Sequence, residues 1–147
     1  MKYIIFILAF MMAGCSSVMV KEGTLDKTQG KVWVQPGGYQ MRHAIKHSLE
    51  ERNFDLVVGK LSTAKSLKDI AEIDTYTSDA RYAVRIEEGG RWLNPVCLFN
   101  GFWYWSFNAS ISDNQTGKEL LSWNARGCQG YVLRRLEDYL DKLEGKK

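Results

Sequence analysis

The side chains that could take part in chemistry are few and stand far apart in the chain. The two histidines, His43 and His47, are four residues apart, a spacing at which both could face one metal ion from the same side of a helix. Such a pair supplies only two ligands, so Glu50 or Glu51 would have to complete the site. Because no cysteine or third histidine accompanies them, we interpret the pair as part of a solvent-exposed helix face and expect no metal.

Residues that typically carry out catalysis form no motif in this sequence. No serine stands in a nucleophile-elbow pattern, and the glycines do not form a phosphate-binding pattern. The adjacent acidic residues Glu87-Glu88 and Glu137-Asp138 are typical of ordinary loops and helix faces. We therefore expect a protein that is not an enzyme and that binds no cofactor.

The first cysteine predicts a lipid anchor. A lysine and an unbroken apolar run precede Met12-Ala13-Gly14-Cys15, which resembles a bacterial lipobox, with Met12 where leucine is usual. The resemblance implies that residues 1–14 are a signal peptide and that Cys15 carries acyl chains such as palmitate. Ser16 after the cysteine implies transfer to the outer membrane, on its periplasmic face. The alternative is a secreted protein from which Cys15 is removed.

The remaining cysteines, Cys97 and Cys128, predict a disulfide. In an oxidising periplasm an even number of cysteines usually forms such bonds. Two buried free thiols are the alternative. The chain contains no C-x-x-C motif, so we do not expect a redox-active pair.

Composition predicts one modest domain. About 130 residues remain after the signal, which is enough for a single core and too few for two. The chain has 20 basic and 17 acidic residues, a balance that does not favour nucleic acid as a partner. Residues 15–30 are polar and aperiodic, and we interpret them as the lipidated N-terminus and a tether. Residues 31–147 then form the periplasmic domain.

Hydrophobic periodicity predicts an α+β fold. A strand over 31–35, an amphipathic helix within 39–53 and a strand over 54–58 make a β-α-β unit with parallel strands. A third strand is expected over 80–87, and residues 60–79 show only a weak helical pattern. A helix over residues 131–143 should pack on the same sheet face as the first.

The run FWYWSF at 102–107 begins a long strand that ends near Ser112. Odd positions from Trp103 onward are apolar and even positions become polar, so one face of this strand should be buried. Turn residues 113–117 predict a hairpin to a strand beginning KELLSW. The matching apolar faces set three opposed pairs, which are Ile111 with Leu121, Ala109 with Trp123, and Phe107 with Ala125.

Asn100-Gly101 presents a conflict with the disulfide. A two-residue hairpin there would place Cys97 opposite Tyr104, while the register above places Cys128 opposite Tyr104 from the other side. The two cysteines would then lie about 10 Å apart, which is too far for a bond. We favour the disulfide, with residues 95–101 folded as a loop over the end of the sheet.

Five residues are candidates for a partner or ligand patch. Phe102 and Tyr104 lie on the face opposite Trp103 and Trp105, and the loop before them is expected to cover both. If they are open, they form a patch with three further side chains, which are Arg91, Trp92 and Arg126.

The order of these elements resembles a group of Gram-negative envelope lipoproteins. The features that carry the resemblance are Asn53-Phe54 at the helix exit, the strand 80–86 and the hairpin from Asp113 through Trp123. The group contains small outer-membrane lipoproteins whose domain is related to the penicillin-binding-protein activator LpoB, the N-terminal domain of TolB and the core of the curli lipoprotein CsgG. The chain is too short for the pore-forming strands of CsgG and lacks the long tether of LpoB.

The resemblance implies this fold and a tendency to bind other envelope proteins. We therefore expect a non-enzymatic lipoprotein that docks a protein partner as an assembly or accessory factor. The alternative is a small-ligand or cell-wall glycan binder that uses aromatic stacking. A glycan site needs an open cleft with polar groups beside the rings, whereas a docking surface can be flat or a bare sheet edge.

Overall fold

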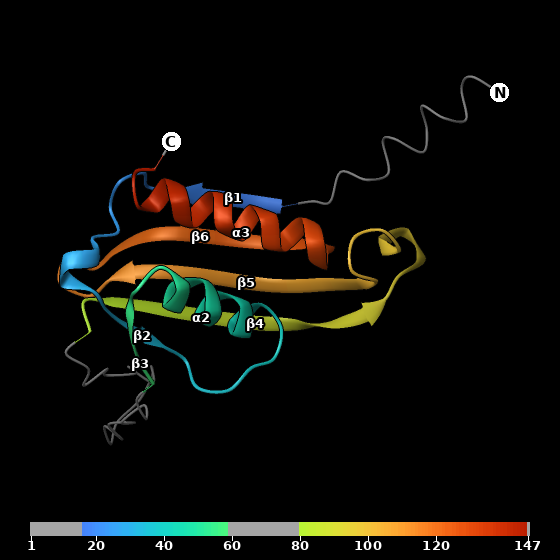
Figure 1. Ribbon diagram of the computed structural model, residues 1–147, viewed down its shortest axis with the longest axis horizontal. Coiled ribbons are helices and arrows are strands. Elements are labelled where there is room, and N and C mark those ends of the chain that lie inside the picture. The colour runs from blue at the N-terminus through green and yellow to red at the C-terminus, as the bar shows by residue number, and fades with distance from the viewer. Residues whose placement is uncertain (1–15, 59–79, 147) are drawn as a thin grey trace, which may run out of the picture.

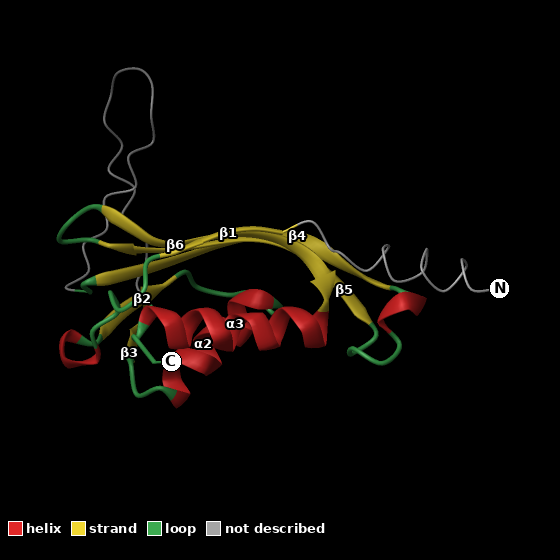
Figure 2. Ribbon diagram, turned by 90° about the horizontal axis from the view of Figure 1, so that it is seen from above, coloured by secondary structure: helices red, strands yellow, loops and turns green. Residues whose placement is uncertain are grey.

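The computed structural model describes residues 16–58 and 80–146 (Figure 1). In these residues the chain forms one mixed six-stranded sheet, with both longer helices on the same face (Figure 2). The strand order is β1-β6-β5-β4-β2-β3. The strands are β1 Ser16–Val20, β2 Lys31–Val34, β3 Asp55–Val57, β4 Tyr82–Leu93, β5 Trp103–Asp113 and β6 Lys118–Cys128, and the helices are α2 Met41–Glu51 and α3 Gln129–Leu143. The predicted single-domain α+β fold is confirmed.

The β2-α2-β3 unit forms as its periodicity predicts. β2 pairs in parallel with both β3 and β4. α2 buries Met41, Ile45 and Leu49, which recur at helical spacing, against the sheet. At the start of α2, the Glu88 carboxylate of β4 accepts backbone N–H groups from Gln40 and from the first turn of the helix. This anion satisfies donors that the helix itself cannot pair.

The β5–β6 hairpin has the predicted register over its central part. All three predicted pairs are present, and a bulge after Ile111 shifts the register by one residue toward the turn. Asp113 accepts the backbone N–H groups of Gln115 and Thr116. Burial alone would raise the pKa of Asp113, but these hydrogen bonds and the charge of Arg81 outweigh it and lower the pKa.

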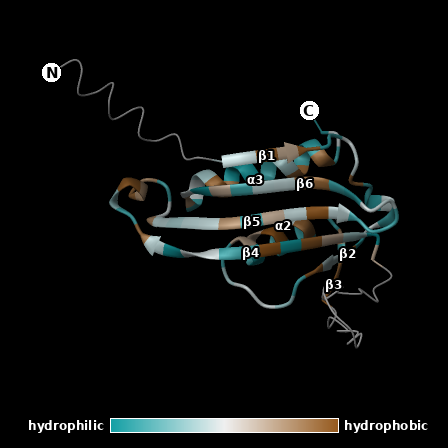
Figure 3. Cartoon of the chain, turned by 180° about the vertical axis from the view of Figure 1, so that it is seen from behind, coloured by the Kyte–Doolittle hydropathy of each residue, from teal (hydrophilic) through white to brown (hydrophobic). Residues whose placement is uncertain are grey.

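The core lies between the helices and one face of the sheet. At its centre Trp123 packs edge-to-face against Phe107 and against Tyr139 of α3, with ring centroids 4.7 and 5.0 Å apart. The opposite face, turned toward the viewer in Figure 3, exposes the polar side chains of Asn108 and Asn124 in the middle of β5 and β6. One buried and one polar face are typical of antiparallel strands.

The prediction of a tether over residues 15–30 is wrong for its described part. β1 pairs antiparallel with β6, and Leu25 is buried in the core. The backbone N–H of Leu25 donates to the carbonyl of Leu143, at the other end of the chain. The prediction failed because it rested on the polar composition of the segment alone. The groups that order the segment lie about a hundred residues away in sequence, and local periodicity carries no information about them.

Several predictions fall outside the described residues. They are the signal peptide over residues 1–14, the lipidation of Cys15 and the weak helix over residues 60–79. No helix within 16–58 and 80–146 is long and apolar enough to cross a membrane.

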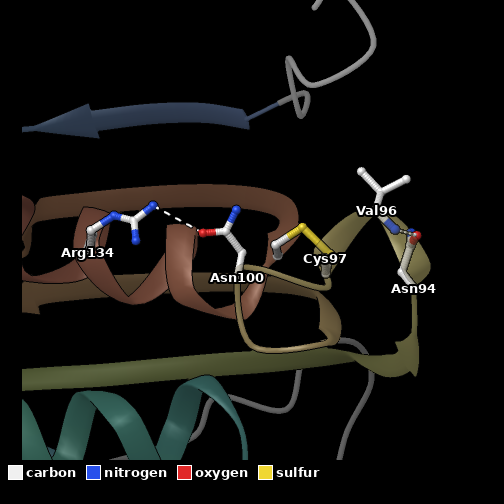
Figure 4. Close-up of a disulfide and its surroundings, with 6 residues drawn as sticks. Asn94, Val96, Cys97, Asn100 and Arg134 are labelled. Atoms are coloured by element: carbon white, nitrogen blue, oxygen red, sulfur yellow. Dashed lines mark hydrogen bonds between the residues drawn. A yellow bond between two sulfur atoms is a disulfide. The ribbon is translucent and has the colours of Figure 1, made fainter. Parts of the chain in front are cut away.

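The loop between β4 and β5 resolves the conflict at Asn100-Gly101. Cys97 and Cys128 form the predicted disulfide, with their Cα atoms 5.3 Å apart (Figure 4). Cys128 lies opposite Tyr104 as predicted, but Trp92 occupies the other side of Tyr104. Cys97 instead belongs to a short 3-10 helix, Pro95–Cys97, which folds over the end of the sheet.

Candidate functional site

An open cleft of about 560 Å³ lies between α2, α3 and the far ends of β4 and β5. It exists because the strands are longer than the helix that covers them. α2 begins at Met41, level with Glu88, whereas β4 and β5 continue to the pair formed by Leu93 and Trp103. At this end, the face of the sheet that carries the helices is therefore partly uncovered.

An arginine held between two aromatic rings forms one wall of this cleft. The guanidinium carbon of Arg91 lies 4.6 Å from the centre of the Trp103 ring and 5.0 Å from the centre of the Tyr39 ring. Arg91 and Trp103 come from paired strands, and Tyr39 comes from the segment that leads into α2. The stack orders three long side chains at the cleft, and it leaves Tyr39 65% exposed.

Two polar groups in the cleft lining are buried without a partner. Gln40 is only 2% exposed, and neither its amide oxygen nor its amide nitrogen has a hydrogen-bond partner among the described residues. The indole nitrogen of the buried Trp105 is also unpaired within the described part of the chain. Unsatisfied buried polar groups typically cost about 1–3 kcal/mol each. Two of them beside one cleft are groups whose missing hydrogen bonds a bound ligand or an ordered water can supply.

His43 and His47 both line the cleft and are exposed. His47 Nδ1 lies 3.3 Å from a carboxylate oxygen of Glu51. Over residues 16–58 and 80–146, no group of three or more His, Cys, Asp and Glu side chains could hold a metal ion. The arrangement fits the predicted solvent-exposed helix face, on which Glu50 is exposed as well.

The floor of the cleft contains a serine and a carboxylate that already serve the packing of the helices. The Ser48 hydroxyl of α2 donates to Glu137 of α3 at 2.6 Å. Arg52 Nη2 lies 2.8 Å from the other carboxylate oxygen of Glu137. A carboxylate that is paired with arginine is a poor general base, so these groups serve to join the two helices.

The predicted patch of five residues is divided between the two faces of the sheet. Trp92 and Tyr104 stack on the helix-free face with ring centroids 4.9 Å apart, and Arg126 is exposed diagonally across from Tyr104. Arg91 belongs to the cleft on the other face. Phe102 is 54% exposed in the loop, so the expectation that the loop covers it is wrong. The disulfide ties the loop to Cys128, Phe102 stays exposed, and Tyr104 is half-buried.

Sequence reasoning missed Tyr39 and Gln40, and it placed Trp103 and Trp105 only in the core. A signal for Gln40 does exist, because it stands four residues before Ala44 and continues the apolar stripe of α2 with a polar side chain. The overhang of the sheet has no such local signal. It depends on where two helices end relative to strands distant in sequence.

Comparison with known proteins shows a shared fold and no family. No family model matches the chain, and no curated protein matches it. A structure of the PelC dodecamer from Paraburkholderia phytofirmans has a TM-score of 0.53 at 12% identity, covering 90% of this chain and 99% of that chain. A point variant of that dodecamer has a TM-score of 0.51 at 10% identity, covering 91% and 99%. Such low identities indicate the fold alone, and the expected kinship with LpoB, TolB and CsgG stays a prediction.

Proposed function

We propose that this protein is a non-enzymatic envelope lipoprotein that binds a neutral, hydroxyl-rich ligand of the cell-wall glycan class in the cleft. The observation that carries this proposal is the buried, unpaired amide of Gln40 beside the aromatic wall of the cleft. A sugar ring presents apolar C–H faces to aromatic side chains, and its hydroxyls both donate and accept hydrogen bonds. An amide oxygen and an amide nitrogen together match those two roles.

The charges around the cleft favour a neutral ligand over a charged one. The lining carries both signs of charge, positive on Arg91 and Arg134 and negative on Glu51 and Glu137. Glu137 is already paired with Arg52, and Arg91 is held between two rings. A strongly anionic or cationic ligand would meet both signs of charge at once.

Titration of the domain with soluble oligosaccharides of N-acetylated hexosamines tests this proposal. Residues 16–147 contain every described helix and strand, so this fragment keeps the whole described fold. Binding is followed by tryptophan fluorescence, since Trp103 and Trp105 line the cleft. We expect Gln40→Leu to weaken binding about tenfold or more, because it removes the amide hydrogen bonds.

Gln40→Leu should leave the fold at least as stable as before. Replacing an unsatisfied buried amide by an apolar side chain of similar size removes a desolvation penalty. Weaker binding together with an unchanged or raised unfolding midpoint would therefore separate a ligand role from a structural one. Trp92→Phe, on the opposite face, is the matched control and should bind as the unchanged protein does. Equal binding by the Gln40 variant and the unchanged protein would refute the proposal.

The second candidate is the protein-docking function expected from the sequence, and the free edge of β1 favours it. β1 is the outermost strand of the sheet as described, is uncharged, and exposes Val18 and Met19. Such an edge offers unpaired backbone groups to a strand of a second chain. PelC, which shares the fold, is a dodecamer, so a second copy of this chain is the first partner to test.

Light scattering of the domain with and without Val18→Lys tests edge docking. If the edge of β1 joins copies, the lysine should convert the assembly to monomers, because a charge on an edge strand opposes pairing. Asn108→Lys, on the middle of the helix-free face, is the control and should not change the mass. Two results together would exclude this edge as a docking surface. They are a monomeric mass for the unchanged domain, and no crosslinked adduct from a photoreactive side chain placed at Val18 in the native envelope.

A further inference from the structure

The loop end of the sheet carries an exposed apolar surface, which we name the apolar tip. Phe99 is 94% exposed, and four neighbours are between 51% and 66% exposed; these are Leu93, Val96, Leu98 and Phe102. Five large apolar side chains lie within ten consecutive residues. A soluble surface rarely concentrates so much apolar area, and such patches usually mark a place of contact.

The apolar tip is held in place from several directions. The disulfide joins Cys97 to Cys128 at the start of α3. Asn94 accepts the backbone N–H of Val96 at 3.0 Å. The Asn100 carbonyl accepts the N–H of Gly130 at 2.8 Å, and Arg134 reaches the Asn100 side chain at 3.4 Å (Figure 4). Because these bonds fix the loop backbone, the exposed side chains are presented outward at little further entropic cost on contact.

Exposed arginines and no acidic residues stand in the segments that adjoin the apolar tip. Residues 89–112 and 120–136, which include the loop, the adjoining strand ends and the first turns of α3, contain no aspartate or glutamate. Three exposed arginines, Arg91, Arg126 and Arg134, stand at these strand ends and in the first turns of α3, whereas Arg135, further along α3, is paired with Asp138 at 4.0 Å. An apolar surface with a basic rim complements the surface of an anionic phospholipid bilayer, which offers hydrocarbon below and negative headgroups above.

The start of the domain lies toward the same end of the sheet. β1 pairs antiparallel with β6, so that Ser16 lies opposite Ala125, three residues before Cys128 (Figure 1). Three residues of strand span about 10 Å. Because residues 16–20 are a strand of the sheet and not a tether, a lipid on the preceding Cys15 would hold this end of the domain close to the bilayer.

We propose that the apolar tip inserts into the surface of an anionic phospholipid bilayer as a second membrane contact beside the N-terminus. Side chains of this kind enter the headgroup and upper acyl region, about 5–10 Å deep. Together with a lipid on Cys15 the tip would attach the domain at two places and so set its orientation on the membrane. The inference is independent of what the cleft binds.

Vesicle sedimentation of the fragment 16–147, which lacks any lipid, tests the tip alone. The probes are vesicles of phosphatidylethanolamine with phosphatidylglycerol, and neutral phosphatidylcholine vesicles for comparison. We expect binding to the anionic vesicles that weakens with salt, as the basic rim requires. Phe99→Asp should lower partitioning about tenfold or more, because it removes the most exposed ring and adds a negative charge. Val58→Asp is the matched control and should bind normally. Val58 is 56% exposed and directly follows β3, the outermost strand at one edge of the sheet.

Thermal unfolding of both variants verifies that each keeps its fold, as the exposure of both positions predicts. Failure of the unchanged fragment to bind anionic vesicles would overturn the proposal, as would equal binding by the Phe99 and Val58 variants. A tip variant that changes the oligomeric state while vesicle binding persists unchanged would assign the tip to a protein interface and would also overturn it.

Discussion

The two ends of the sheet differ in the interactions that hold them together. At the loop end the connection is covalent, through Cys97 and Cys128, and large apolar side chains project beyond it. At the opposite end, where α3 terminates, charged side chains make the connection. Glu144 lies 2.9 Å from Lys27, 2.8 Å from Lys146 and 3.2 Å from Arg52.

This charged end also joins the two helices. Arg52, which follows α2, lies 2.7 Å from Asp141 and 2.8 Å from Glu137, both on α3. The side chain of Arg52 is 11% exposed and that of Glu144 only 2% exposed. Arg52 and Glu144, the two most buried charges, each have three partners of the opposite sign. Removal of one partner would leave a buried charge less well compensated for its loss of hydration.

The contrast between the disulfide at one end and the ion pairs at the other indicates which end is suited to water and which to an apolar surface. Ion pairs at a lipid-facing end would have to lose their remaining hydration, which is unfavourable. A disulfide carries no charge, so its strength does not depend on the surrounding dielectric. This difference agrees with the proposed membrane contact, in which the end with the disulfide would lie against a bilayer and the end with the ion pairs would stay in water. Four predictions, made with three variants, would break or sharpen this comparison.

Removal of the disulfide should have the largest effect. The bond closes a loop with a sequence separation of 31, for which loop entropy predicts about 3.5–4 kcal/mol of stabilisation. We expect the double variant Cys97→Ser with Cys128→Ser to lower the free energy of unfolding by that amount, measured by urea denaturation. A loss below about 1 kcal/mol would mean that packing alone holds the loop end.

Glu144→Gln should have the next largest effect. The substitution removes the charge that Lys27, Lys146 and Arg52 share, and charge-assisted hydrogen bonds of this kind are worth about 2 kcal/mol. Urea denaturation measures the change, with Glu119→Gln, an exposed residue of β6, as the control expected near zero. Equal effects of the two variants would show that the cluster contributes only general electrostatics.

Acid should loosen the charged end before the disulfide end. Burial alone would raise the pKa of Glu144, but Lys146 and Lys27 outweigh it and lower the pKa below its ordinary value of 4.5. A lowered folded-state pKa gives stabilisation that is complete above the unfolded-state pKa and lost as pH falls through the folded-state value. We expect Glu144→Gln to lack this part of the acid-induced loss, and the double cysteine variant to keep it, in unfolding measured from pH 7 down to pH 3.

Phe99→Ser should have the smallest effect on stability. Because Phe99 is 94% exposed, it contributes little buried area, and the change should stay within about 0.5 kcal/mol. Denaturation with urea is again the measurement. A loss above 1 kcal/mol would mean that the ring packs against the protein in solution and is not available to a membrane.

Much of the fold was predictable from local pattern. The alternation from Trp103 to Ile111 and the turn residues before Gly117 were sufficient to predict the β5–β6 pairs, since a one-residue slip would have exposed every apolar side chain. The stripe of Met41, Ile45 and Leu49 predicted α2 in the same way. Little of the cleft was predictable, because Tyr39 and Gln40 meet Arg91 only where the segment before α2 packs on the sheet.

By itself the sequence predicted the class of fold and the central register of the β5–β6 hairpin, and it favoured the disulfide between Cys97 and Cys128. The first two follow from periods of two and of three to four along the chain, and the disulfide follows once Cys15 is set aside as the lipidated residue. Only the tertiary structure decided that residues 16–20 are an edge strand, that Phe99 and its neighbours stay uncovered, and that Gln40 is buried beside an open cleft. These depend on where distant elements begin and end relative to one another, and that information is set by packing across the sheet.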